Sequence, residues 1–147
     1  MTGKTVEIQS LVPHRGPMLL ISEIVSLDAG SASTRSVVAD HWPLVDGKGA
    51  NVMVLIELVA QTAAVNNGWE LLQREGPAAS TLGWIVGIKS ARFMLDVVPL
   101  GSTVLVESFN QMEYDDFRVI QGTATIDGAV AAVVTLQLMK AHSGSPV

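Results

Sequence analysis

The chain has 147 residues, of which 48% are hydrophobic and 16% charged, enough apolar material for an ordinary core and too little charge for a disordered chain. The net charge of -5 excludes the basic surface that nucleic acids require. The absence of cysteine excludes disulfides and cysteine metal sites. The N-terminus lacks the apolar core of a signal peptide, and no stretch is long enough to span a membrane. We expect a cytoplasmic protein without membrane contact, with one domain over residues 1–142 and a flexible C-terminal tail over 143–147.

The expected elements are a hairpin, one long helix and a run of strands. In chain order they are a helical turn within Val6–Val12, strands over Met18–Leu27 and Ser31–Ala39, an irregular segment over Asp40–Ala50, a helix from Val52 to Gly76 with Asn51 as its N-cap, and strands over Leu82–Phe93, Thr103–Glu113, Arg118–Ile126 and Ala129–Lys140. The first half of the helix is apolar on nearly every side, so the strands must cover it. We therefore predict an α+β fold of the hotdog type, in which a curved antiparallel sheet wraps one long central helix.

Glu57 is the ionisable residue in the apolar part of this helix. A buried carboxyl group is costly unless it is paired, protonated or used in chemistry. Gln61 follows four residues later, on the same helix face, where it can hydrogen-bond Glu57. We expect the apolar setting to raise the pKa of Glu57, which suits a general acid. The alternative is an exposed face on which the pair is simply solvated.

The histidines are scattered without the spacing of metal ligands, so no metal site is expected. His41 precedes Trp42 and Pro43 in the irregular segment and, considered alone, is more readily structural than catalytic. His14 lies in the turn Pro13–Pro17, and we interpret it as a structural histidine that bonds the backbone.

The start of the predicted helix is a possible site for an oxyanion. Around Asn51, Val52 and Met53 the backbone N–H groups have no intrahelical acceptor, and they lie at the positive end of the helix dipole. Such groups can stabilise a carbonyl oxygen that gains negative charge. Glu57 follows just over one turn later, so a proton donor would lie close by.

Five motifs in chain order resemble the 3-hydroxyacyl-ACP dehydratases of bacterial fatty-acid synthesis, which are hotdog proteins. They are Leu11–Leu20, Asp40–Pro43, Ile56–Gln61, Val86–Phe93 with Val97–Gly101, and Gly122–Gly128. The resemblance covers nearly the whole chain. It implies a lyase that removes water from a 3-hydroxyacyl thioester to give a trans-2-enoyl thioester. It also implies that acyl carrier protein or CoA carries the substrate on phosphopantetheine, with no other cofactor.

The resemblance also implies roles for individual residues. The catalytic base is His41, which takes a proton from C2, and the catalytic acid is Glu57, which protonates the leaving hydroxyl. The implied substrate-binding residues are Val52, Gln61, Gly87 and Arg92. Among these, Gln61 orients Glu57, and the N–H of Val52 binds the thioester carbonyl. In the family the two catalytic residues come from different chains, which implies a homodimer or a higher even oligomer.

The loop from His41 to Asn51 departs from the family pattern, because it is longer and lacks a second His-Pro and a Met-Pro-Gly. Val52 stands where the family has a glycine that leaves room for the thioester. We expect a divergent branch, such as one that serves aryl-polyene or other specialised pathways. Two other functions stay open: a hotdog thioesterase in which Glu57 activates water, and a non-catalytic partner subunit of an active dehydratase.

Two surfaces follow from a carrier-bound substrate. Acyl carrier proteins are acidic, so an acidic enzyme needs a local basic patch to bind one. The candidates are Arg15, Lys89, Arg92 and Arg118, although these could be ordinary surface charges. An acyl tunnel along the helix would be lined by residues such as Met53, Leu55 and Met94, which could equally belong to the core.

Overall fold

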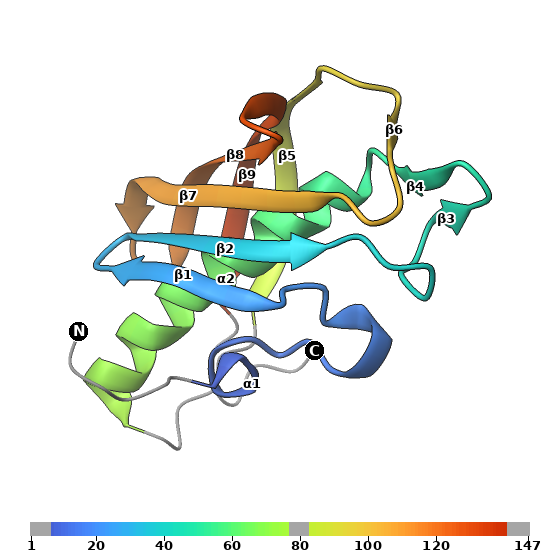
Figure 1. Cartoon of the computed structure of the whole chain (residues 1–147). Helices are drawn as coiled ribbons and strands as arrows, with labels where there is room; N and C mark the ends of the chain where they lie inside the picture. The colour runs from blue at the N-terminus through green and yellow to red at the C-terminus, as the bar shows by residue number, and fades with distance from the viewer. Residues whose placement is uncertain (1–6, 77–82, 141–147) are drawn as a thin grey trace.

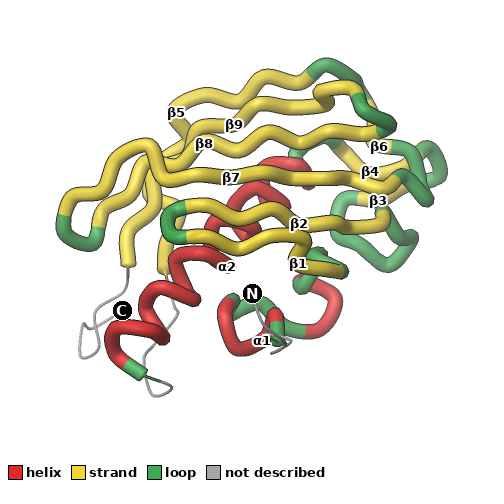
Figure 2. Tube along the Cα trace, turned by 60° about the vertical axis from the view of Figure 1, so that its left-hand side comes forward, coloured by secondary structure: helices red, strands yellow, loops and turns green. Residues whose placement is uncertain are grey.

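The computed structural model describes residues 7–76 and 83–140, so the predicted tail over 143–147 lies outside the described residues. The elements are α1 (Ile8–Leu11), a 3-10 turn (Gly16–Met18), β1 (Glu23–Asp28), β2 (Ser31–Val37), β3 (Val45–Asp46), β4 (Gly49–Asn51), α2 (Val54–Glu75), β5 (Gly83–Phe93), β6 (Val97–Val98), β7 (Thr103–Tyr114), β8 (Phe117–Ile126) and β9 (Ala129–Lys140). Six strands form an antiparallel sheet in the order β1-β2-β7-β8-β9-β5. The sheet curves round α2, as Figures 1 and 2 show from two sides. The predicted α+β hotdog fold is confirmed.

The helix and the sheet lie close together where α2 passes β8. Gly122 lies in β8, between its partners on β7 and β9. A Cβ atom added there would lie 2.8 Å from Cγ2 of Val59 and closer still to Cγ1. Val59 itself is fully buried in the main core. The glycine therefore sets the distance between the helix and the middle of the sheet.

The segment before β1 packs against the other side of α2. Leu11 and Val12 are fully buried in a second apolar cluster that includes Val65 of the helix. Gly68 lies beneath this segment, and a Cβ atom on it would come within 3.0 Å of the carbonyl carbon of Leu11 and closer to its oxygen. A glycine is needed here because a larger residue would push the N-terminal segment away from the helix.

The prediction of a strand over Met18–Leu27 is wrong in its first half, because β1 begins only at Glu23. The reason is a long-range contact that no local pattern shows. Gln61 of α2 accepts a hydrogen bond from the backbone N–H of Leu20 (3.0 Å) and donates one to the carbonyl of Met18 (2.7 Å). These backbone groups therefore bond to a helix side chain instead of joining the sheet.

The loop before α2 is more regular than predicted. It contains β3 and β4, which form a three-stranded sheet with β6, so the irregular segment expected over Asp40–Ala50 is only partly so. The helix begins at Val54 with Met53 as its N-cap. Asn51, the predicted cap, lies two residues too early: its Oδ1 accepts a hydrogen bond from the N–H of Met53 (2.9 Å), and its own N–H donates to the carbonyl of Leu44 (2.9 Å).

Strand β5 forms one edge of the main sheet, with β9 as its neighbour. Large apolar side chains on both of its faces are half exposed, namely Trp84, Ile85, Val86 and Ile88. An edge strand of this length with an apolar surface favours pairing with another chain. Within the described residues, no helix is both long enough and apolar enough to cross a membrane.

Candidate active site

A cavity of about 320 Å³ runs along α2 beside β5 and the ends of β8 and β9. Its lining residues are Pro13, His14, Glu57, Ala60, Ala64, Asn67, Gly68, Leu71, Arg74, Gly83, Trp84, Ile85, Asp116, Arg118, Leu138, Met139 and Lys140. Most of the wall is apolar. A cavity does run along the helix, but the residues expected to line an acyl tunnel are absent from its wall: Leu55 is fully buried in the core, while Met53 and Met94 are half exposed elsewhere.

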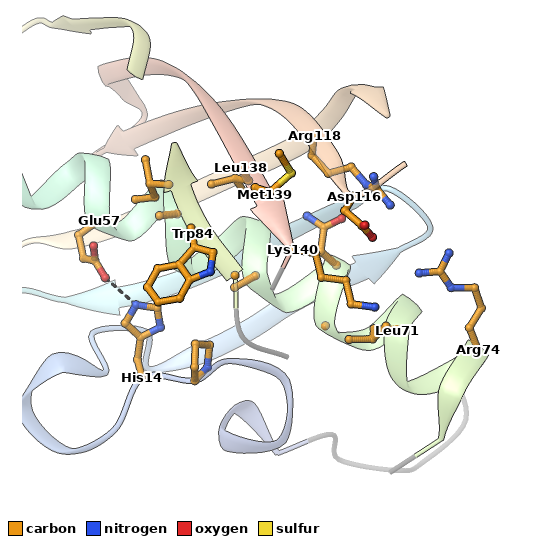
Figure 3. A pocket seen from close by; sticks show the side chains of 17 residues that line it. His14, Glu57, Leu71, Arg74, Trp84, Asp116, Arg118, Leu138, Met139 and Lys140 are labelled. Atoms are coloured by element: carbon orange, nitrogen blue, oxygen red, sulfur yellow. Dashed lines mark ion pairs between the residues drawn. The ribbon is translucent and has the colours of Figure 1, made fainter. Parts of the chain in front are cut away.

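Glu57 stands at one end of this cavity and is paired with His14 (Figure 3). Nε2 of His14 lies 2.9 Å from Oε1 of Glu57, and the two side chains are 26% and 28% exposed. Nε2 of Gln61 donates a hydrogen bond to the same Oε1 (2.9 Å). The predicted bond between Gln61 and Glu57 is confirmed. The interpretation of His14 as a residue that bonds the backbone is wrong, because its ring reaches the carboxylate on α2.

The charge state of Glu57 differs from the expectation. Burial of the carboxyl group does raise its pKa, but the hydrogen bonds from His14 and Gln61 and the charge of His14 together outweigh burial and leave the pKa below its ordinary value of 4.5. The prediction of a raised pKa counted burial alone and is wrong for the unliganded chain. Glu57 is therefore a carboxylate at neutral pH in this state.

His41 lies apart from this pair within one chain. It is exposed and does not line the cavity, whereas Trp42, the next residue, is buried in the core. Trp42 donates its backbone N–H to the carbonyl of Ala39 (3.1 Å), which fixes the backbone beside His41. The structure thus brings Glu57 and Gln61 together and leaves His41 on the surface of the same chain.

At the start of α2, the hydrogen bonds leave Val52 as the available donor among the three residues proposed for a carbonyl site. Asn51 and Met53 already use their N–H groups, as described above. Within the described residues, the N–H of Val52 has no acceptor, although its carbonyl accepts from Leu55 (3.0 Å). The backbone here could bind the oxygen of a thioester.

The two remaining predicted substrate-binding residues lie on the edge strand. Gly87 and Arg92 belong to β5, and neither lines the cavity. A Cβ atom on Gly87 would lie 3.4 Å from Cδ of Gln137 and closer to its Oε1, so the glycine makes room for the neighbouring strand. Arg92 is exposed. In the described part of a single chain, neither residue therefore shares the cavity with Glu57.

The residues proposed for a basic patch do not form one cluster on a single chain. Arg118 lines the far end of the cavity and forms an ion pair with Glu113 (3.3 Å). The guanidinium of Arg15 donates to backbone carbonyls of its own segment. Lys89 is exposed on β5. In residues 7–76 and 83–140, no cluster of three or more His, Asp or Glu side chains is placed to hold a metal ion.

Comparison with known proteins places these features in a family. A model of the ApeP-like family, described as ApeP dehydratase, matches residues 6–145. The 3-hydroxyacyl-acyl-carrier-protein dehydratase FabZ of Acetivibrio thermocellus is 35% identical over 137 residues, which cover 86% of this chain and 87% of that protein. FabZ of Streptococcus pyogenes serotype M1 is 29% identical over 140 residues, covering 88% and 93%. Among solved structures, the dehydratase heterocomplex ApeI:P of Xenorhabdus doucetiae superimposes with a TM-score of 0.86 at 19% identity, over 96% of this chain and 95% of that one.

Proposed function

Because the chain belongs to the ApeP-like dehydratase family, we propose that it removes water from a 3-hydroxyacyl thioester and produces a trans-2-enoyl thioester. The observation that carries this proposal is the carboxylate of Glu57, which is held by hydrogen bonds at one end of a largely apolar cavity along α2. Such a cavity can accept an acyl chain. We assign to this carboxyl group the exchange of a proton with the hydroxyl at C3.

In the proposed reaction, His41 takes the proton from C2, the C2–C3 double bond forms, and the bond from C3 to oxygen breaks. Glu57 protonates the departing oxygen, which leaves as water, and the N–H of Val52 stabilises charge on the thioester carbonyl. Glu57 must be protonated before this step. Burial already opposes its charge, and a substrate that expels water from the cavity strengthens that effect. The ionised resting form is the base for the reverse reaction, the addition of water.

The placement of His41 supports a site shared between two chains. His41 does not line the cavity that contains Glu57, so within one chain the base is missing. The apolar edge strand β5 offers a surface for a second subunit, and one solved neighbour is a dehydratase heterocomplex. We therefore propose that a homodimer, or a pair with a related subunit, brings His41 of one chain to Glu57 of the other.

We further propose that the thioester is carried by acyl carrier protein or CoA, that no additional cofactor takes part, and that the protein works in the cytoplasm. The FabZ relatives are named for substrates on acyl carrier protein. Gly87 and Arg92 would contribute to substrate binding only in the assembled protein, because both lie on the exposed edge strand.

The test gives the purified protein a 3-hydroxyacyl thioester and follows enoyl product and free thiol together. We expect enoyl product, and a loss of about 100- to 10,000-fold in His41→Ala and in Glu57→Gln. Asp40→Ala, an exposed neighbour of His41, is the matched control and should retain activity. Free thiol without enoyl product would identify a thioesterase instead. Neither product from the protein alone would favour a non-catalytic partner subunit, and the solution mass of the same sample shows whether the chain pairs.

A further inference from the structure

Both hydrogen-bond donors that reach Glu57 bind the same oxygen. Nε2 of His14 and Nε2 of Gln61 each lie 2.9 Å from Oε1. A carboxylate oxygen accepts about two such bonds in its plane, so Oε1 is fully used. Within the described residues, Oε2 has no partner, and Glu57 lines the cavity. The two oxygens are therefore not equivalent: one is anchored and the other is left for a ligand.

The segment that carries His14 is fixed against α2 on both sides of the histidine. On its N-terminal side, Leu11 is buried against Gly68 of α2. On its C-terminal side, Gln61 binds the backbone at Met18 and Leu20. The turn itself is tied by Arg15, whose guanidinium donates to several carbonyls of the segment. The imidazole is thus held from both sides while it faces Glu57.

The ring of His14 is oriented as a donor. Its Nδ1 is buried without a hydrogen-bond partner among the described residues, and its Nε2 faces the carboxylate. A buried N–H without an acceptor costs more than an unused ring lone pair, so a ring with a single proton carries it on Nε2, and in either charge state Nε2 is the donor. This tautomer donates to Oε1. The other charged residues of the cavity, Arg74, Asp116, Arg118 and Lys140, lie at its opposite end (Figure 3).

We propose that His14 is a positioning residue for the reaction: together with Gln61 it anchors Oε1 of Glu57, so that Oε2 is the oxygen that exchanges a proton with the substrate. This inference rests on the proposed function. It assigns His14 no direct contact with the reacting atoms. His14 is a partner of Glu57 from the same chain, whereas His41, the proposed base, would come from the second subunit.

The test compares His14→Ala and His14→Gln with the wild-type protein. Without the imidazole, Glu57 keeps only Gln61 and can rotate, so kcat for enoyl formation should fall about 10- to 100-fold in His14→Ala, with KM changed by less than about threefold. The glutamine amide can reach Oε1 as a donor, so His14→Gln should recover much of kcat. Gln9→Ala, an exposed substitution in the same N-terminal segment, controls for the stability of that segment and should leave kcat unchanged.

A second readout separates positioning from a merely structural role. The titration of the Glu57 carboxyl carbon, followed by NMR in the assembled protein, should move to higher pH in His14→Ala because two influences that lower its pKa are removed. The limb of the pH–rate profile that belongs to Glu57 should move the same way. An unchanged titration and an unchanged kcat would each overturn the inference. If the wild-type protein forms no enoyl product, the proposed function fails, and the titration alone still decides whether His14 holds Glu57.

Discussion

The close packing of Gly122 in β8 against Val59 in α2 gives a sharp stability prediction. Adding a methyl group in Gly122→Ala places a carbon against both γ-carbons of Val59, one of them 2.8 Å away. Val59 is β-branched and fully buried in α2, and a β-branched residue in a helix strongly prefers one rotamer, so it does not readily turn away from the new methyl. Either the helix or β8 must therefore move.

The magnitudes follow from the atoms involved. Overpacking of this kind costs about 1–3 kcal/mol. Val59→Ala removes two buried carbons at about 0.8 kcal/mol each, and the cavity left behind brings its cost to about 2–3 kcal/mol. In the double variant, the new methyl of residue 122 occupies the space that Val59 vacates. Its loss should therefore be only about 1–2 kcal/mol, well below the sum of the single losses.

Urea unfolding of the four proteins, followed by far-ultraviolet circular dichroism, measures these differences by linear extrapolation. The double-mutant cycle isolates the coupling between Gly122 and Val59. If the two single losses add to within about 0.5 kcal/mol in the double variant, the side chains do not compete for the same space and the reasoning is refuted.

Two further predictions concern the N-terminal segment and the acid. Gly68→Ala should lose about 1–2 kcal/mol of stability despite the better helix propensity of alanine, because its methyl group would meet the carbonyl of Leu11. Gly47→Ala is the control and should lose none, since the added carbon has nothing within 4 Å. Equal stabilities of the two variants would contradict the close packing at Gly68. The pKa of Glu57 is below 4.5 in the folded chain, so its ionised pairing stabilises the fold above that pH and is lost as the pH falls through the folded value. The stabilities of the wild type and of Glu57→Gln should therefore differ most at neutral pH and converge as the pH falls through the folded pKa of Glu57, which lies below 4.5. A difference that grows on acidification would show the opposite shift.

The long elements could be predicted from the sequence because each carries a local pattern. The prediction of β9 over Ala129–Lys140 matches its observed limits, and the apolar face of α2 identified it as the buried helix. The short strands β3, β4 and β6 were missed, since two or three residues are too few to show a period. The predicted start of β1 was wrong because the strand limit depends on the side chain of Gln61, which lies 41 residues from Leu20 in sequence.

The site could be predicted only where its contacts are local in sequence. Glu57 and Gln61 share a helix face, so their contact could be expected from spacing alone. His14 was assigned to the backbone because its partner lies on a distant element. One signal was available: a histidine fixed between Pro13 and Pro17, in a chain whose buried glutamate had an amide partner in Gln61 but no cationic partner on its own helix. The raised pKa failed because it depended on that missing partner.

The attachment of the N-terminal segment to α2 has a consequence for how the protein loses activity. His14, Glu57 and Gln61 belong to a single chain and are held by its own packing, whereas the proposed base belongs to the neighbouring one. Separation of the subunits would then remove the base and leave the acid fully assembled. Each isolated chain would keep the acid and its hydrogen-bond partners in place. Recovery of activity would then be limited by the rate at which two subunits associate, with no refolding of the site.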